Sequence, residues 1–353
     1  MWKKIILNRK FNEYSGAIHN HTSYSKDGRI PLREIVNYAL DAKLDFITTN
    51  DHNDLACLQD EAYVKNKTSL LIIVGVEVND PDDNHHLLVF NTNKVITECD
   101  PSIYVNTYTS EKAICFAAHP NERRITAEFR KYEWIDRSLN KFDGIEIWNY
   151  GSSWLGKVNP IFNGILCVFF PELFVRKPLR KNLNFWDDLN LANLRKSAIA
   201  STDAHDVIKK KGPFTFRILS YKRLFRTLRT NVLLPENVPF TEDNVLNALR
   251  KGHSYICNYA MGKPWTFYAA MDSGEGKSAI FGEEIILSTG MKFHFNLPLI
   301  CDVHLYHNGK KIDSKHEKNG CFKINEPGFY RLEISRYRYG WIYTNPIYVL
   351  PYK

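Results

Sequence analysis

Short apolar runs alternate with stretches of helical spacing through about the first 205 residues. After Pro31, apolar residues recur three and four positions apart from Leu32 to Leu40, which predicts an amphipathic helix. Apolar runs rich in β-branched residues predict strands near 17–18, 45–49, 70–78, 86–90, 114–118, 144–148 and 197–201. Strands separated by helical stretches favour parallel pairing, and repetition of such units predicts an α/β barrel.

The rest of the chain has a different pattern. Residues 151–196 mix apolar helix-like pieces with basic ones and are expected to form a helical insertion. Residues 242–251 predict a last helix, with Thr241 or Asp243 as N-cap and Gly252 after its end. From residue 263, Gly, Asn and Asp separate short alternating runs, which predicts a small all-β sandwich over 263–353 beside a barrel domain over 1–262.

Composition narrows the function only a little. The formal charge of +8 is modest, and the basic residues are scattered rather than gathered on one stretch, so it suits an anionic substrate or an ordinary solvated surface. Seven dispersed cysteines without a C-x-x-C argue against a disulfide framework or a zinc knuckle. The apolar run at 5–7 is too short for a signal peptide, and no segment reaches the length of a membrane span, so we expect a cytoplasmic protein without membrane association.

Histidines and carboxylates stand where the predicted strands end. These residues are His19, His21, Asp27, Asp51, His52, Glu77, the pair His85 and His86, His119, Asp203 and His205. Positions i and i+2 of a strand lie on one side, so His19 and His21 can face a common ion. Grouping so many ionisable side chains is unfavourable unless cations compensate them, and imidazole with carboxylate suits Zn, Mn or Fe. His253 and the four histidines after it fall outside this pattern.

The motifs, in order, are His-x-His-Thr-x-x-Ser-x-Asp-Gly, Asp-His, Gly-x-Glu, Ala-His-Pro and Ser-x-Asp-Ala-His. In this combination they resemble the PHP (polymerase and histidinol phosphatase) family of metallophosphoesterases over about the first 205 residues. The β-rich tail is similar to a module appended in one branch of that family.

The resemblance implies a distorted seven-stranded barrel that holds two or three divalent metal ions. By this resemblance, His19, His21, Glu77 and Asp203 hold the first ion. Glu77 bridges to a second, completed by His119 and by His86, which we prefer over His85 because it directly precedes an apolar strand. Asp27, His52 and His205 hold the third, and the carboxylate of Asp27, where many relatives have a histidine, favours Mn or Mg there.

The expected function is hydrolysis of a phosphate mono- or diester by metal-activated water. We assign catalytic roles to Glu77 and Asp203, and Arg123 and Arg124 either clamp the phosphate or form a solvated loop pair. Asp51 either orients a ligand imidazole or caps a helix. The expected substrate is a small anionic phosphate ester, such as a nucleotide or short oligonucleotide. Alternatives are a nuclease, an amidohydrolase-like C–N hydrolase, and a metal-stabilised binding protein without catalysis.

Overall fold

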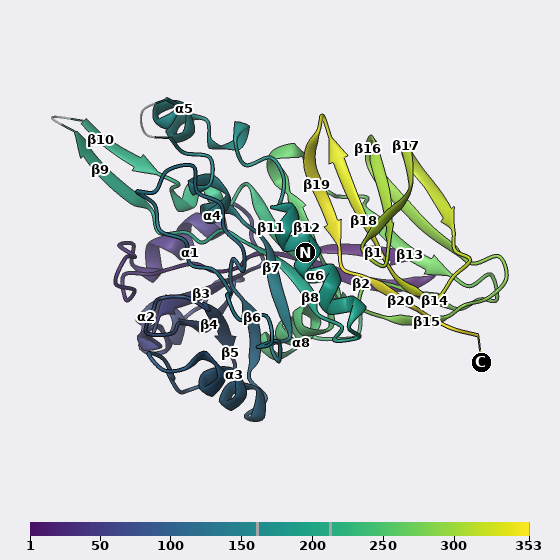
Figure 1. The fold of residues 1–353 in the computed structure, drawn as a ribbon, viewed down its shortest axis with the longest axis horizontal. Coiled ribbons are helices and arrows are strands. Elements are labelled where there is room, and N and C mark those ends of the chain that lie inside the picture. Colours follow the sequence, from purple (N-terminus) through teal and green to yellow (C-terminus); the bar gives the residue numbers. More distant parts are fainter. Residues whose placement is uncertain (160–161, 212–213, 353) are drawn as a thin grey trace. The chain divides into compact units, whose positions relative to one another are not determined.

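The computed structural model describes residues 1–159, 162–211 and 214–352 (Figure 1). The chain divides into two compact units, each made of separate chain segments. One, here called the α/β unit, contains residues 15–183 and 200–229. The other, the β-rich unit, contains residues 1–14, 184–199 and 230–353. The predicted boundary at residue 262 stays a prediction.

Six strands run side by side in the α/β unit (Figure 1). They are β2 (Arg9–Ala17, whose last residues belong to this unit), β3 (Phe46–His52), β4 (Leu71–Val78), β5 (Leu87–Phe90), β6 (Ile114–Ala117) and β7 (Gly144–Asn149). The pairs β2–β3, β3–β4 and β6–β7 are parallel, whereas β5 is antiparallel to both β4 and β6. Residues 79–86 are too few for the crossover that a parallel partner would need.

After β8 (Ser197–Ser201), the chain returns to the segment that follows β2. Thr202 N–H donates to the Ile18 carbonyl, and Asn20 forms an isolated parallel bridge with Ala204. The mixed α/β fold is confirmed, but the structure shows no closed barrel over the residues that it describes. The expectation of a run of parallel strands fails at β5.

Helices of the α/β unit follow the predicted periodicity where it is strongest. Helix α1 (Leu32–Asp41) buries Leu32, Ile35, Val36 and Ala39. Helix α3 (Pro101–Ser110) has the same length, whereas α2 (Glu61–Val64), α4 (Tyr150–Leu155), α5 (Gly164–Phe169) and α7 (Tyr221–Leu224) are shorter. The described residues also form three 3-10 turns, η1 (Ala56–Gln59), η2 (Pro171–Leu173) and η3 (Tyr259–Met261). Strands β9 (Val207–Lys211) and β10 (Phe214–Ile218) pair as a separate two-stranded sheet. Helix α6 (Arg180–Leu191) begins in the α/β unit and continues into the β-rich unit.

The β-rich unit is built around long antiparallel strands. Its strands are β1 (Trp2–Ile6), β11 (Leu228–Pro235), β12 (Ser254–Asn258), β13 (Tyr268–Asp272), β14 (Ser278–Ala279), β15 (Glu284–Ile286), β16 (Lys292–His307), β17 (Lys310–Lys323), β18 (Gly328–Arg336), β19 (Tyr339–Thr344) and β20 (Ile347–Leu350). Strand β16 pairs with β13, β17 and β18, and β18 pairs in turn with β19 and β20. Because these pairings form one connected network, the predicted two-sheet sandwich is not confirmed.

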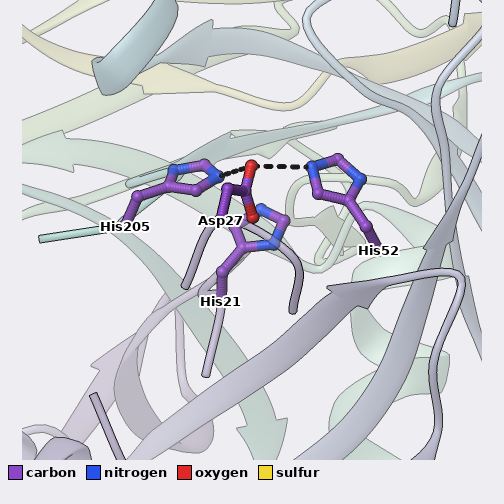
Figure 2. Close-up of side chains that lie close together, drawn as sticks. All are labelled: His21, Asp27, His52 and His205. Carbon is purple, nitrogen blue, oxygen red and sulfur yellow. Dashed lines mark ion pairs between the residues drawn. The ribbon is translucent and has the colours of Figure 1, made fainter. Parts of the chain in front are cut away.

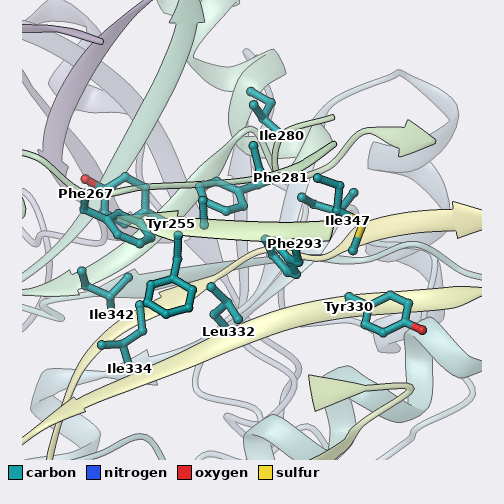
Figure 3. Close-up of a cluster of buried hydrophobic side chains, with 14 of the residues drawn as sticks. Tyr255, Phe267, Ile280, Phe281, Phe293, Tyr330, Leu332, Ile334, Ile342 and Ile347 are labelled. Carbon is teal, nitrogen blue, oxygen red and sulfur yellow. The ribbon is translucent and has the colours of Figure 1, made fainter. Parts of the chain in front are cut away.

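An apolar core holds the β-rich unit together. Figure 3 shows aromatic and aliphatic side chains from different strands gathered there, among them Tyr255, Phe293 and Leu332. Helix α8 (Glu242–Lys251) has the bounds that the sequence predicts, with the Thr241 hydroxyl accepting from Asn244 N–H and Gly252 at φ 73°. Among the described residues, none of the helices has both the length and the apolarity needed to cross a bilayer.

Candidate metal centre

The nine predicted ligands all belong to the α/β unit, and the loops after its strands carry most of them. His19 and His21 follow β2, His52 ends β3, Glu77 lies near the end of β4, and His119 follows β6. His19, His119 and Asp203 adopt positive φ angles of 63°, 26° and 49°. Such backbone is unfavourable for residues other than glycine, and it gathers at functional sites where the surrounding structure enforces it.

Glu77 lies at the centre of the cluster. One carboxylate oxygen, Oε2, is 3.0 Å from His19 Nε2, 3.4 Å from His21 Nε2 and 3.3 Å from His52 Nδ1. The other, Oε1, is 2.8 Å from His86 Nδ1 and 3.3 Å from His119 Nε2. The side chain is 1% exposed. Each oxygen therefore faces a different set of imidazoles, which is the arrangement that a bridging carboxylate requires.

Asp27 is the centre of a second group, which Figure 2 shows. Its Oδ2 lies 3.3 Å from His52 Nε2 and 3.1 Å from His205 Nε2. The His21 ring stacks on the His205 ring with centroids 4.0 Å apart. Potential ligand atoms of His21, Asp27, His52 and His205 all lie within 4.8 Å of one another.

In two further groups, the potential ligand atoms also lie within 4.8 Å of one another. His19, His21 and Asp203 form one, with Asp203 Oδ1 3.5 Å from His19 Nε2 and 3.4 Å from His21 Nε2. His52, Glu77 and His86 form the other. The structure thus brings all nine predicted ligands together, since His119 joins them through Glu77. Their roles as ligands stay predictions.

The donor set fits divalent cations. Among the residues that the structure describes, His21 Nε2, His52 Nδ1 and His86 Nε2 are buried without a hydrogen-bond partner. A buried polar atom without a partner is unfavourable, and imidazole nitrogens aimed at carboxylates are ligands that transition metals accept. Neighbouring groups also overlap at His21 or His52, so the three groups form one continuous cluster.

Glu146, in the middle of β7, is a site residue that the sequence analysis missed. Its Oε1 is 2.8 Å from His19 Nδ1, and its Oε2 accepts from His119 N–H at 2.9 Å and from Asn149 at 2.9 Å. The signal was present, because a carboxylate in the apolar run 144–148 needs a partner once the strand is buried. Asp83 was missed as well and lies 3.3 Å from His86 Nε2.

His85 and His86 differ clearly in position. His85 Nδ1 is 2.6 Å from Asp80, and its Nε2 accepts from Asp136 N–H at 2.9 Å, so both ring nitrogens are used outside the cluster. His86 instead contacts Glu77. This placement favours His86, as preferred from the sequence.

Asp51 neither orients a ligand imidazole nor caps a helix, the two roles expected of it. Its carboxylate accepts from the Thr22 backbone N–H at 2.5 Å and from the Thr22 hydroxyl at 2.8 Å. It therefore fixes the loop that follows His21 rather than an imidazole or a helix end. Asn20 stands between His19 and His21 in the sequence, and its side-chain amide donates to the carbonyls of Ala17 and Thr48.

Arg123 and Arg124 differ in their freedom to bind a ligand. The Arg124 guanidinium is 2.7 Å from Glu122 and donates to the carbonyls of Arg123 and Arg130, and its side chain is 3% exposed. It is held within its own loop. Arg123 is exposed. The phosphate clamp stays a prediction, and the geometry leaves Arg123 as its better candidate.

Mutual charge interactions shift the pKa values of the cluster strongly. Burial lowers the pKa of His86, but Glu77 and Asp83 outweigh it and raise that pKa to about 10. Burial likewise opposes protonation of His205, whose pKa Asp27 and Asp203 raise to about 9. Without cations, protons on these rings therefore balance the carboxylates.

His21 has the opposite shift. Burial, together with the neighbouring rings of His205, His52 and His19, lowers its pKa to about 3. Burial would raise the pKa of Glu77, yet the surrounding imidazoles hold it well below its usual range. A neutral imidazole beside an ionised carboxylate is the protonation state in which both bind metal.

Residues 17–103 match the family model described as the PHP domain. The resemblance predicted from the motifs is therefore confirmed for this part of the chain, which contains His19, His21, Asp27, His52, Glu77 and His86. No curated protein matches the chain significantly.

Three solved structures are similar to the chain at low identity. The first is a two-domain protein from Bacteroides vulgatus ATCC 8482 containing a predicted PHP-like metal-dependent phosphoesterase, with 12% identity, a TM-score of 0.47 and 95% of each chain covered. A candidate metal-dependent phosphoesterase from Bifidobacterium adolescentis ATCC 15703 has 13% identity and a TM-score of 0.36 over 57% of this chain and 92% of that one. An amidohydrolase from Chromobacterium violaceum, with bound sulfate and no metal, has 12% identity and a TM-score of 0.34 over 59% and 95%. At these TM-scores the likenesses do not establish a shared fold.

Proposed function

We propose, from the premise that residues 17–103 are a PHP domain, that this protein is a metal-dependent phosphoesterase that hydrolyses a phosphate mono- or diester. The observation that carries the proposal is Glu77, whose two oxygens face two different sets of imidazoles in a buried cluster. A carboxylate so placed suits a pair of cations, which is a common device for transfer at phosphorus.

The residues would divide among three ions. His19, His21, Glu77 and Asp203 would hold the first, Glu77 with His86 and His119 the second, and Asp27, His52 and His205 the third. The donors suit Zn, Mn or Fe, with Mg or Mn acceptable beside Asp27. When bound, such cations act as Lewis acids that activate water and neutralise charge on the phosphoryl oxygens.

The protein's own residues would orient the ligands and leave one side of the cluster accessible to substrate. Glu146 fixes the ring of His19 from the side opposite Glu77, and Asp51 fixes the loop after His21. Exposure within the cluster rises from 1% at Glu77 to 16% at Asp203, 22% at His205 and 40% at Asp27. A substrate would therefore approach from the side of Asp27 and His205, where a phosphate group can reach the cations from solvent.

The test combines metal content with turnover. The purified protein should contain divalent metal and hydrolyse a chromogenic phosphodiester, phosphomonoester or both. Glu77→Gln keeps the size of the side chain but removes its charge, so metal content and turnover should fall together. The loss in rate should exceed about a hundredfold, since even residues that only support ligands are worth about 10–100-fold.

Glu128→Gln, at an exposed position, is the matched control and should keep both properties. Full metal content and full rate in Glu77→Gln would refute the bridging role. Metal without turnover of any phosphate ester would favour the binding protein, and turnover of an amide in place of phosphate esters would favour the C–N hydrolase.

A further inference from the structure

The β-rich unit contains a pocket of about 190 Å³ that plays no part in the proposed metal chemistry. Its lining joins the end of α8, the turn at Gly282, the segment before β8 and the loop from β19 to β20. The residues with functional groups there include Arg195, Ser197, Arg250, Lys251, His253 and Tyr348. We propose that this pocket is a second anion site, which binds free phosphate or the phosphate group of a small ester.

The charge around the pocket is positive. Arg195, Arg250 and Lys251 line it, and its described lining includes no carboxylate. Glu284 pairs with Arg195 from outside the lining. Burial lowers the pKa of His253, and the charges of Lys251 and Arg9 lower it as well, against the opposing charge of Glu283.

A second observation also points to a ligand. The Ser197 hydroxyl is buried and lacks a hydrogen-bond partner among the described residues, although the residue is only 3% exposed and lines the pocket. Buried hydroxyls without partners are uncommon, and each calls for an explanation such as a bound group. A phosphate oxygen would accept the hydrogen bond that Ser197 can donate.

The frame around these groups is rigid. The Asn345 side chain accepts from Ala198 N–H and donates to the carbonyls of Ala198 and Ser254. Gly282 N–H donates to the Pro346 carbonyl, and a Cβ on Gly282, at φ 80°, would lie 2.0 Å from the Lys251 carbonyl oxygen. The Arg195 guanidinium lies 5.1 Å from the centre of the Tyr348 ring. A preformed site avoids much of the entropy cost of ordering its side chains on binding.

The size of the pocket limits the ligand. A volume of 190 Å³ is far more than a single water needs and less than the roughly 300–1,000 Å³ typical of pockets for drug-sized ligands. A tetrahedral oxyanion, alone or on a short carbon chain, fits this range.

Basic residues in the last turn of α8 also interact favourably with the helix dipole. That effect accounts for Arg250 and Lys251 being basic. It does not account for Arg195, which comes from a different segment, or for the unpartnered Ser197 hydroxyl.

Hydrogen exchange of the full chain can locate the site. Exchange is compared in sodium phosphate and in sodium chloride at equal ionic strength. Millimolar phosphate should slow exchange in peptides that contain residues 250–253, 282 and 345–348. Separate runs with inorganic phosphate and glycerol phosphate distinguish a free anion from an esterified one, and protection of these peptides by either supports the site.

Two variants test the assignment by calorimetric titration with whichever phosphate compound protects the peptides. Lys251→Gln and Ser197→Ala should each weaken binding by about tenfold, or about 1.4 kcal/mol, because each removes a hydrogen bond to a charged ligand. Lys310→Gln, an exposed lysine of the same unit, should change the affinity less than twofold. Absence of protection in these peptides, or affinity unchanged in both Lys251→Gln and Ser197→Ala, would overturn the proposal. Because these peptides contain none of the metal ligands, failure here leaves the phosphoesterase proposal intact.

Discussion

Glu146 and Glu77 bind the same imidazole from opposite sides. His19 Nδ1 is 2.8 Å from Glu146, and His19 Nε2 is 3.0 Å from Glu77. A carboxylate on the far nitrogen of a liganding histidine fixes its tautomer and orientation and increases its basicity. Glu146 is therefore a positioning residue whose effect on an ion is transmitted through His19.

Glu146→Gln should weaken metal binding by about tenfold, the lower end of the range for residues that support ligands. The amide oxygen can still accept one hydrogen bond, so His19 keeps part of its orientation but loses the negative charge. Metal affinity, measured by competition with a chromogenic chelator, checks the effect.

Glu61→Gln, at an exposed position on α2, serves as the reference variant. The unfolding midpoint of Glu146→Gln after chelation should stay close to that of the wild type. A large fall in this midpoint with unchanged metal affinity would show that Glu146 acts only on stability.

Single residues were predictable where strand ends carry His and carboxylate groups. All nine candidate ligands converge, because residues at the ends of neighbouring strands meet at one edge of the sheet. Glu146 was missed because it lies inside a strand, where alternation gives the side it faces but not its partner. The pairing of Arg124 with Glu122 depends on a loop conformation that no periodicity describes.

At the scale of elements, a buried ion pair attaches α6 to the long strands of the β-rich unit. Arg331 of β18 donates from Nε to Asp187 Oδ1 at 2.9 Å and from a terminal nitrogen to Oδ2 at 2.7 Å. A second terminal nitrogen donates to Glu333 at 2.7 Å, and the guanidinium lies 4.4 Å from the centre of the Tyr306 ring. Arg331 has no exposed surface, so its charge relies on these partners.

Asp187→Ala should lower the free energy of unfolding by about 3–5 kcal/mol, because removing one partner leaves the other charge buried without full compensation. Urea unfolding of the wild type and the variant measures the difference. Asp188→Ala changes the neighbouring exposed carboxylate and should cost less than about 0.5 kcal/mol. Equal effects of the two substitutions would show that the pair with Arg331 contributes little.

Elements were predictable when several local signals agreed. Helix α8 combines apolar spacing, a threonine cap and a glycine at its end, and its bounds match the prediction. The direction of β5 was not predictable from its apolar run alone, since parallel and antiparallel buried strands share that pattern. The length of the link before it was the better indication, because residues 79–86 cannot hold a crossover helix.

At the scale of the whole molecule, metal binding should act on one unit. All the candidate ligands belong to the α/β unit, so the added free energy of binding stabilises that part of the structure first. Hydrogen exchange with and without added metal should show slower exchange at residues 17–21, 50–53, 76–87 and 202–206, while residues 290–335 stay unchanged. Protection confined to the latter range would contradict the location of the metal centre.

The class of the fold was predictable and its closure was not. Alternating strands and helices indicate a mixed α/β structure, which the chain has. Closure of a barrel depends on strand tilt and on the register between distant segments. Neither can be inferred from the local periodicity of the sequence.

The interleaving of the two units has a consequence for how the protein is made on the ribosome. The chain passes between them at 14–15, 183–184, 199–200 and 229–230. Every residue of the α/β unit has been synthesised by position 229, when only residues 1–14 and 184–199 of the β-rich unit precede that point. During translation, the histidine cluster can therefore assemble and capture ions while β1 and the paired start of β2 still lack the strands that follow residue 230.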